Sequence, residues 1–401
     1  MTAFLIAFVP RAALGALILF FELEMFFAPD SYAYASNGSD LASFWHGRGV
    51  EPDSWVMDGG QGHYVMANAA VYYLLGRAPL VLVLLNAAAG AWTAILSARL
   101  ATRLAGAAAG RRVFWLVALF PSLVLWSSLN LRDSFLILAV VGATWSAVEL
   151  REKGQLHAGI PLLLWLLVLA ALREYAFVVV ASSVIVGLLL GRQEHPFRSY
   201  AAAAAIIVIA ALVTSQLASS GALLDNASLE RLAEIRGGFA AGAASGYQTN
   251  VEPGSLRGEI ASLPLGLAYF LLGPFPWAVA GTLSILTIPE VLLWYWLLSK
   301  TWPGVRSLRR EHPGALWVLV GVVVGVSVFY ALISGNVGTA YRHRAQILPL
   351  FLTIAGIGWA ANDRRSSSWS TERATAAMGP VSDAAVVCDG PSGDVRGAGG
   401  R

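Results

Sequence analysis

Long apolar segments alternate with short polar ones along the chain, and their lengths indicate the architecture. A helix needs about 20 mostly apolar residues to cross a hydrocarbon layer of ~30 Å. A helix also pairs its own backbone groups, as the interior of a bilayer requires. The pattern therefore predicts an all-α fold, a polytopic transmembrane helical bundle of about ten spans. The expected spans are residues 3–28, 78–98, 113–129, 135–150, 158–172, 175–191, 199–218, 278–298, 315–333 and 345–361.

Two further apolar stretches are too short or too interrupted to cross a bilayer comfortably. They cover residues 64–76 and 261–273. We expect both to form interfacial or re-entrant helices that pack at the edge of a site.

Composition supports the membrane interpretation. Only 13% of the 401 residues are charged and 57% are hydrophobic, whereas soluble domains carry about 25% charged residues. The basic residues lie between apolar segments instead of forming one stripe, so we expect membrane lipids and no nucleic acid as partners. Cys388 is the only cysteine and the six histidines are scattered, so no ligand pattern supports a divalent metal as cofactor.

Basic residues also orient the bundle, because short cytoplasmic loops are enriched in Lys and Arg. Both termini are therefore predicted to be cytoplasmic in a multi-pass protein of the plasma (inner) membrane. The bundle would cover residues 1–361, with external loops at 29–77 and 219–277, and residues 362–401 would form a disordered cytoplasmic tail. This orientation follows from five basic connections on one side of a ten-span bundle, at residues 99–112, 151–153, 192–198, 300–310 and 364–365.

Ionisable residues near the hydrocarbon layer are candidates for function, and the first of them is Asp30. It follows the first span in the sequence FFAPDSYAY, together with Tyr32 and Tyr34. A carboxylate there can act as a general base for an incoming hydroxyl group. The alternative is that Asp30 caps the short helix after Pro29 or simply marks the membrane interface.

Two short turns on the predicted external side each contain an arginine beside a carboxylate. One holds Asn130, Arg132 and Asp133, and the other holds Arg173 and Glu174. We interpret them as substrate-binding residues. The alternative for each is an interfacial ion pair that only orients its helices.

The densest polar group is Tyr341, Arg342, His343 and Arg344, in the sequence GNVGTAYRHR. Two planar, permanently charged guanidinium groups suit a phosphate or diphosphate. The alternative is ordinary flanking charge, although basic residues are disfavoured on the external side. His343 has three open interpretations: a proton donor, a phosphate ligand or a surface residue.

Four short motifs together resemble one group of membrane enzymes: FFAPDSYAY, YVMANAAVYYLLG, PSLVLWSSLNLRDS and GNVGTAYRHR. They look like polytopic glycosyltransferases of the C-type fold, which includes dolichyl-phosphate-mannose mannosyltransferase-like enzymes, and like related bacterial polysaccharide polymerases. The resemblance implies a polyprenyl-phosphate or polyprenyl-diphosphate sugar as donor. It also implies Asp30 as base, with Arg132, Arg342 and Arg344 as head-group ligands.

The leading hypothesis is therefore a membrane glycosyltransferase that transfers a lipid-linked sugar to an envelope glycan or lipid acceptor at the external face. One rival is a transporter or flippase of lipid-linked sugars, which would place polar or broken helices near the bilayer midplane. Another is a non-catalytic scaffold for envelope assembly. The absence of a phosphate-binding glycine loop in the sequence disfavours nucleotide-driven chemistry.

Overall fold

The computed structural model describes residues 1–49, 52–57, 59–153, 156–190, 196–218, 229–241, 246–247, 254–278 and 282–377. Within those residues every regular element is a helix, and one isolated β-bridge joins Gly246 to Asn336. The all-α fold class is confirmed.

The first part of the chain contains helices α1 to α9, and several begin at a proline. Proline favours the first helical position because its missing N–H would be unpaired there anyway. The elements are α1 (Thr2–Phe20), α2 (Glu24–Phe27), α3 (Pro29–Trp45), the 3₁₀ helix η1 (Ser54–Met57), α4 (Gly59–Leu75), α5 (Pro79–Ala105), α6 (Ala107–Leu119), α7 (Pro121–Trp126), α8 (Asp133–Lys153), the 3₁₀ helix η2 (Leu156–Ala158) and α9 (Gly159–Leu172).

The second part continues in the same way. Its elements are α10 (Glu174–Leu189), α11 (Pro196–Ala218), α13 (Leu229–Ala240), α14 (Leu256–Leu272), α15 (Thr282–Glu311), α16 (Pro313–Ile333), α17 (Val337–Arg344) and α18 (Leu348–Ala377).

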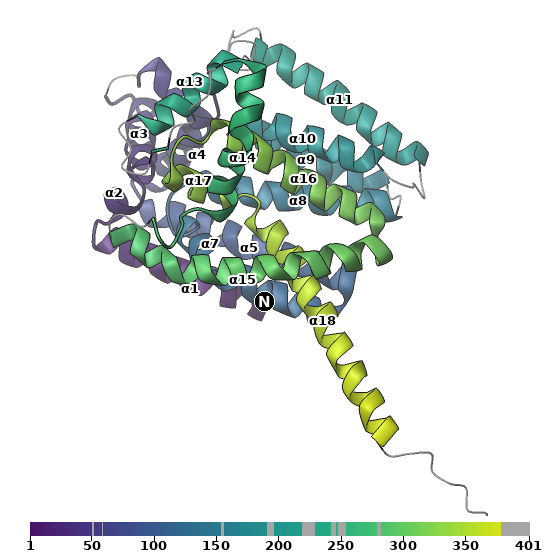
Figure 1. The fold of residues 1–401 in the computed structure, drawn as a ribbon. Helices are drawn as coiled ribbons and strands as arrows, with labels where there is room; N and C mark the ends of the chain where they lie inside the picture. Colours follow the sequence, from purple (N-terminus) through teal and green to yellow (C-terminus); the bar gives the residue numbers. More distant parts are fainter. Residues whose placement is uncertain are drawn as a thin grey trace, which may run out of the picture. The chain divides into compact units, whose positions relative to one another are not determined.

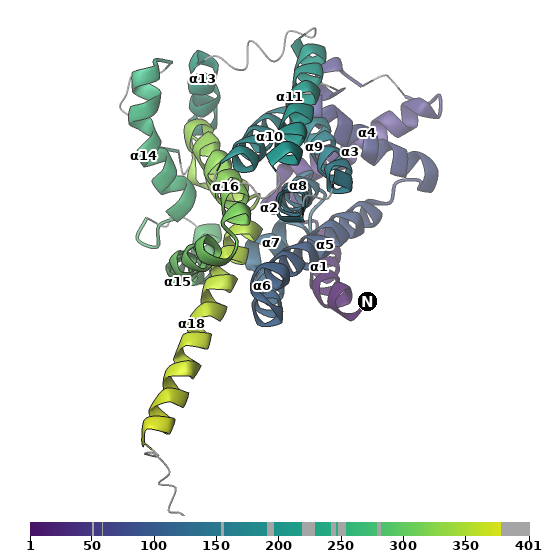
Figure 2. The same cartoon turned by 90° about the vertical axis from the view of Figure 1, so that its right-hand side faces the viewer.

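Helices α8, α9, α10 and α16 pack against one another in the middle of the bundle (Figure 1). Gly187 lets α10 approach α16 closely, because a Cβ atom at this position would lie 2.7 Å from Cα of Val318. Helices α1, α5 and α6 form a second group of neighbours, and α13 and α14 both contact α16 (Figure 2). The two groups meet where α5 packs on α8.

Four helices are long and apolar enough to cross a membrane: α1, α5, residues 133–152 of α8, and α16. The bent pair of α17 and α18 would add a fifth. Three predicted spans correspond to shorter apolar helices, namely α9, α10 and the first part of α11. The multi-pass bundle is thus observed, and the count of ten spans stays a prediction.

Two predicted spans are interrupted. The segment 113–129 breaks at Phe120, because Pro121 lacks an N–H and its ring clashes with the carbonyl group of Val117 one turn earlier. The segment 3–28 breaks after Phe20, where Glu22 adopts a positive φ of 53° before α2 begins.

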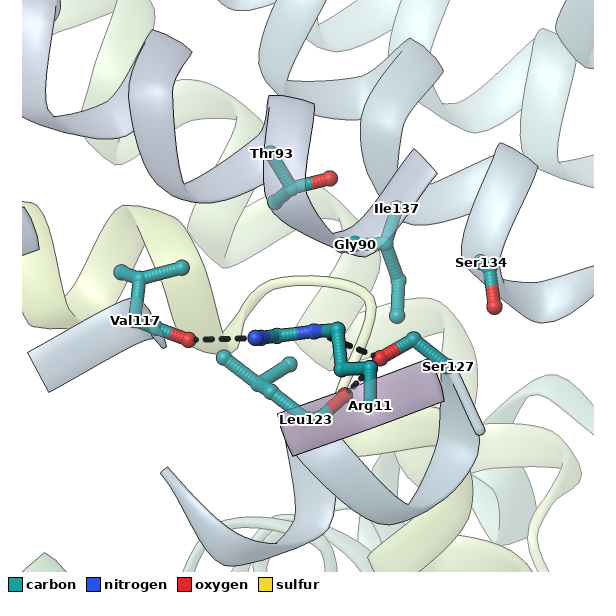
Figure 3. A pocket seen from close by; sticks show the side chains of 8 residues that line it. All are labelled: Arg11, Gly90, Thr93, Val117, Leu123, Ser127, Ser134 and Ile137. Carbon is teal, nitrogen blue, oxygen red and sulfur yellow. Dashed lines mark hydrogen bonds between the residues drawn. The ribbon is translucent and has the colours of Figure 1, made fainter. Parts of the chain in front are cut away.

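Arg11 fastens α1 to the break between α6 and α7 (Figure 3). Its guanidinium group donates to the carbonyl oxygens of Val117 at 3.0 Å and Ala118 at 2.7 Å, which the break leaves without helical partners. It also donates to the hydroxyl group of Ser127 at 2.8 Å. Arg11 is only 1% exposed, so this buried charge holds the segment that leads into the turn at residues 127–132.

The predicted external loop 29–77 is largely helical, since α3 and α4 occupy most of it and pack on each other. The predicted loop 219–277 contains α13 and α14, and its remaining parts lie mostly outside the described residues. The contacts divide the chain into Met1–Ala361 and Asn362–Arg401. Helix α18 continues to Ala377, so the first part of the predicted tail is helical, and residues 378–401 lie outside the described residues.

Candidate active site

Charged side chains from four helices meet in one place. Asp30 lies in the first turn of α3, Asp133 begins α8, Arg173 is the N-cap residue of α10, and Arg342 lies in α17. We call these four residues the charged cluster. Two of them, Asp30 and Asp133, are carboxylates at helix N-termini, where the partial positive charge of the helix favours an anion.

Arg342 bridges the two carboxylates of the charged cluster. Its Nε and Nη2 atoms donate to Oδ2 of Asp133 at 2.9 and 2.6 Å, while Nη1 donates to Oδ2 of Asp30 at 2.8 Å. The planar guanidinium group makes this possible, because its N–H groups point in fixed and different directions. The bridge joins residues that are about three hundred positions apart in the sequence.

Asp30 and Asp133 have different surroundings. Asp133 is 1% exposed and lies between two cations, with Nη2 of Arg173 at 3.6 Å in addition to Arg342. A buried carboxylate of this kind is held by its partners and is costly to leave unpaired. The side chain of Asp30 is 53% exposed and has one cationic partner. Asp30 is therefore the carboxylate that an incoming substrate can reach.

Aromatic and polar side chains enclose the cluster. Trp126 lies under Arg342, with the guanidinium carbon 5.8 Å from the ring centroid. Arg173 donates to the hydroxyl group of Tyr330 at 3.2 Å, and Tyr330 donates in turn to Gln346 at 2.8 Å. His343 is buried and stacks on Tyr330 with ring centroids 4.4 Å apart. A surface position for His343 is therefore wrong.

Arg132 adds a third cation beside the cluster. Its Nη1 atom donates to the carbonyl oxygen of Leu172 at 3.1 Å, next to Arg173 in the sequence. The Nε atoms of Arg132 and Arg173 are buried and have no hydrogen-bond partner among the described residues. Three guanidinium groups and two carboxylates leave a net charge of +1 here, from +3 and −2. Unpaired buried donors with excess positive charge suit an anionic ligand.

The structure corrects two sequence-based alternatives. Ala28 is the N-cap residue of α3, and no side chain caps this helix, so the cap role of Asp30 is wrong. Asp133 pairs with Arg342 and Arg173 from other helices instead of its neighbour Arg132. The local ion pair expected in the turn at residues 130–133 is therefore replaced by a tertiary one.

Other predicted site residues lie outside the charged cluster. Arg344 is 1% exposed and donates to the carbonyl oxygens of Leu271 and Gly273 at the end of α14. The ring of Tyr341 lies against Trp126 of α7, with ring centroids 6.4 Å apart. Thus the structure places Arg344 against the end of α14 and Tyr341 against α7.

The remaining predicted residues lie close by but have other contacts. Glu174 lies beside the start of α4, where a Cβ atom on Gly59 would be 3.2 Å from its Oε1 atom. Tyr32 is 49% exposed, whereas Tyr34 is buried edge-to-face against Tyr64 at 4.9 Å.

Asn130 belongs to a buried network of neutral side chains. It accepts a hydrogen bond from the hydroxyl group of Tyr64 at 2.8 Å and donates to Asn68 at 2.7 Å. Burial raises the pKa of Tyr64, so its hydroxyl group stays a neutral donor. The backbone N–H of Asn130 donates to Oγ of Ser31, the neighbour of Asp30. This network fixes the turn against α3 and α4.

Sequence reasoning missed Tyr330, Gln346, Trp126, Asn68 and Asn86. Each is a polar or aromatic residue within an apolar helix or beside one, and an isolated asparagine in an apolar segment was the strongest available signal. Among the described residues, no group of three His, Cys, Asp or Glu side chains is placed to hold a metal ion.

No family model matches the chain, and no curated protein matches it. A solved structure is similar, that of ArnT from Cupriavidus metallidurans bound to undecaprenyl phosphate. The two chains share 16% sequence identity with a TM-score of 0.56 over 92% of this chain and 62% of ArnT. This chain thus matches about 62% of the length of that neighbour. ArnT is a glycosyltransferase of the C-type fold. The comparison shows that this chain shares the fold of ArnT.

Proposed function

We propose that this protein is a membrane glycosyltransferase whose donor is a sugar linked to polyprenyl phosphate or diphosphate, and whose acceptor is an envelope glycan or lipid at the external face. One observation carries the proposal. The fold brings an exposed carboxylate, Asp30, next to three guanidinium groups, of which that of Arg173 is buried and those of Arg132 and Arg342 are partly buried. The structural neighbour ArnT was solved with undecaprenyl phosphate, a lipid phosphate of the kind that transfer from a polyprenyl-phosphate sugar would release.

The chemistry needs one base and one anion-binding group. The acceptor hydroxyl gives its proton to the carboxylate of Asp30, and its oxygen forms a bond to the anomeric carbon of the donor sugar. The bond from that carbon to the phosphate oxygen breaks, and the oxygen keeps the electron pair. Arg132, Arg173 and Arg342 stabilise the charge that develops on the departing phosphate.

The arrangement of charge favours an enzyme over a transporter. Transporters hold their cargo near the bilayer midplane with broken helices. In this chain Asp30, Asp133 and Arg173 all lie at the starts of helices, and α17 carries Arg342 to the same end. The charged cluster thus lies at helix ends, where a substrate from the membrane surface has access.

The test is a transfer assay on protein reconstituted in lipid nanodiscs. Polyprenyl-phosphate sugars and their diphosphate counterparts are offered with candidate acceptors, and glycosylated product and released lipid phosphate are measured together. We expect one released lipid phosphate for each sugar transferred. Movement of intact donor across liposomes without any transfer would support the transporter instead.

A further inference from the structure

A pocket lies between α4, α5, α8 and α9, and none of its lining residues belongs to the charged cluster. Its volume is about 360 Å³. Most of its wall is apolar and comes from Val71, Leu82, Leu85, Phe135, Val168 and Leu172. We call it the α4–α5 pocket. The size and the apolar lining are typical of a small-molecule or lipid-chain site.

The α4–α5 pocket has a side open toward the expected hydrocarbon layer. Leu85 on α5 is 45% exposed and Val168 on α9 is 37% exposed, and both line the pocket. Both helices are apolar, and α5 is long enough to cross a membrane. An occupant can therefore enter from the lipid phase.

The inner end of the pocket is polar but uncharged. Asn86 is 1% exposed, and its Nδ2 atom donates to the hydroxyl oxygen of Tyr64 at 2.9 Å and to the carbonyl oxygen of Leu82 at 3.0 Å. Its Oδ1 atom is buried and has no hydrogen-bond partner among the described residues. Such an unpaired acceptor is costly unless a ligand supplies a donor.

His63 gives the pocket a second acceptor. Its Nδ1 atom lies 2.8 Å from the carbonyl oxygen of Ala171. A carbonyl only accepts, so Nδ1 carries the hydrogen and Nε2 of the neutral ring is left as an acceptor. The lining holds no arginine or lysine, and these two acceptors suit hydroxyl donors. They do not suit an ionised phosphate, which only accepts hydrogen bonds.

Hydrogen bonds connect the pocket to Asp30. Tyr64 lines the pocket and donates to Asn130, whose backbone N–H donates to Ser31 beside Asp30. Leu172 also lines the pocket, and its carbonyl oxygen accepts from Arg132. The pocket thus adjoins the proposed base through a few ordered residues.

We propose that the α4–α5 pocket binds the acceptor, a lipid with an uncharged, hydroxyl-bearing head group. Its chain would lie along Leu82, Leu85 and Val168, and its hydroxyl groups would donate to Asn86 and His63. This inference rests on the proposed function and names the acceptor class. It also places the acceptor in a different site from the anionic donor, which is proposed to bind at Arg132 and the charged cluster.

The probe is a glucoside of a long alkyl alcohol that carries a diazirine on the chain. Protein in lipid nanodiscs is irradiated with the probe, and the labelled peptides are identified by mass spectrometry. Leu85→Trp fills the pocket, and Leu80→Trp is its matched control, because Leu80 lies on the same helix with the same 45% exposure but does not line the pocket. Asn86→Leu removes the unpaired acceptor.

We expect labels on residues of α4, α5 and α9. Labelling should fall about tenfold in Leu85→Trp and in Asn86→Leu, as the loss of roughly one good contact predicts, and should be unchanged in Leu80→Trp. The KM for the acceptor should rise in Leu85→Trp without a change in donor affinity. Thermal unfolding of each variant identifies any variant that fails to fold. If Asn86→Leu fails to fold, labelling of Leu85→Trp still tests the proposal, because Leu85 is half-exposed and tolerates a larger side chain.

Equal labelling of Leu85→Trp and Leu80→Trp would overturn the acceptor pocket. Displacement of the probe by polyprenyl phosphate as effectively as by unlabelled alkyl glucoside would also overturn it, because the pocket would then accept the anionic lipid. Pocket-specific labelling in a protein that transfers no sugar would contradict the proposed function and therefore also the acceptor role. The pocket would then still be a binding site for a glycolipid.

Discussion

Asp30 and Asp133 show how the same side chain takes different roles in different surroundings. Asp133 contacts two guanidinium groups and is shielded from solvent, so it organises Arg173 and Arg342. Asp30 shares only Arg342 and stays half-exposed. A residue that must accept a proton from a mobile substrate needs access, which Asp30 has and Asp133 lacks.

The first prediction concerns Asp30→Asn. This change removes the proton acceptor but keeps the size of the side chain and a hydrogen bond to Arg342. We expect donor binding to persist and sugar transfer to fall by about 10²–10⁴-fold, the usual contribution of a positioned base. Transfer rate and donor affinity are measured on one preparation. The control is Asp40→Asn, at an exposed position of the same helix, which should change neither the transfer rate nor the donor affinity. Unchanged transfer in Asp30→Asn would show that Asp30 is not the base.

The second prediction concerns Arg342→Lys. Lysine keeps the charge, but a single ammonium group cannot hold Asp30 and Asp133 in the geometry of the guanidinium bridge. We expect transfer to fall at least about tenfold and the unfolding temperature to fall, because Asp133 loses part of its pairing. Arg257→Lys, exposed on α14, should change neither quantity. Wild-type activity in Arg342→Lys would remove the bridge from the mechanism.

At the scale of elements, the break between α6 and α7 directs the chain into the site. Pro121 ends α6, and Arg11 supplies the hydrogen bonds that the last carbonyl groups of α6 lack. Helix α7 then leads to the turn with Asn130 and Arg132. The break is needed because a continuous helix over residues 113–129 would carry this turn away from α3.

The third prediction therefore concerns Arg11→Met, which keeps an apolar chain of similar length but leaves the carbonyl groups of Val117 and Ala118 unpaired. Unsatisfied buried acceptors cost about 1–3 kcal/mol each. We expect a lower unfolding temperature, measured in detergent, and a matching loss of folded protein. Arg111→Met, exposed on α6, is the control. If the two variants unfold at the same temperature, Arg11 does not hold the break.

At the scale of the whole molecule, orientation decides where the chemistry takes place. The charged cluster and the basic connections expected on the cytoplasmic side belong to opposite ends of helices such as α8, which begins at Asp133 and ends at Lys153. From the positive-inside rule we therefore expect the cluster to lie at the external face.

The fourth prediction tests that orientation. A cysteine in place of exposed Arg48, just after α3, should react with a membrane-impermeant maleimide in intact cells. Native Cys388 should react only after the membrane is opened. Cys388→Ser in the same background shows which cysteine carries the label. Labelling of Cys388 from outside would reverse the orientation and move the proposed reaction to the cytoplasmic face.

The apolar pattern by itself determined the class of fold. Segments such as 78–98 and 315–333 became α5 and α16, because the bilayer and the backbone leave few structures for a long apolar segment. The sequence also indicated Asp30, Asp133, Arg173 and Arg342 as candidates for function, because charges beside apolar segments are rare and are costly without a role. Local patterns carry this information because burial acts on each segment separately.

Only the tertiary structure decided which charges pair with one another. Arg342 contacts Asp30 and Asp133, while Arg344, two residues later, donates to the end of α14. The direction of a side chain around a short helix depends on its packing partners. The α4–α5 pocket also required the fold, because His63, Asn86 and Val168 come from three helices. A cavity is the space that packing leaves unfilled, so no single segment encodes it.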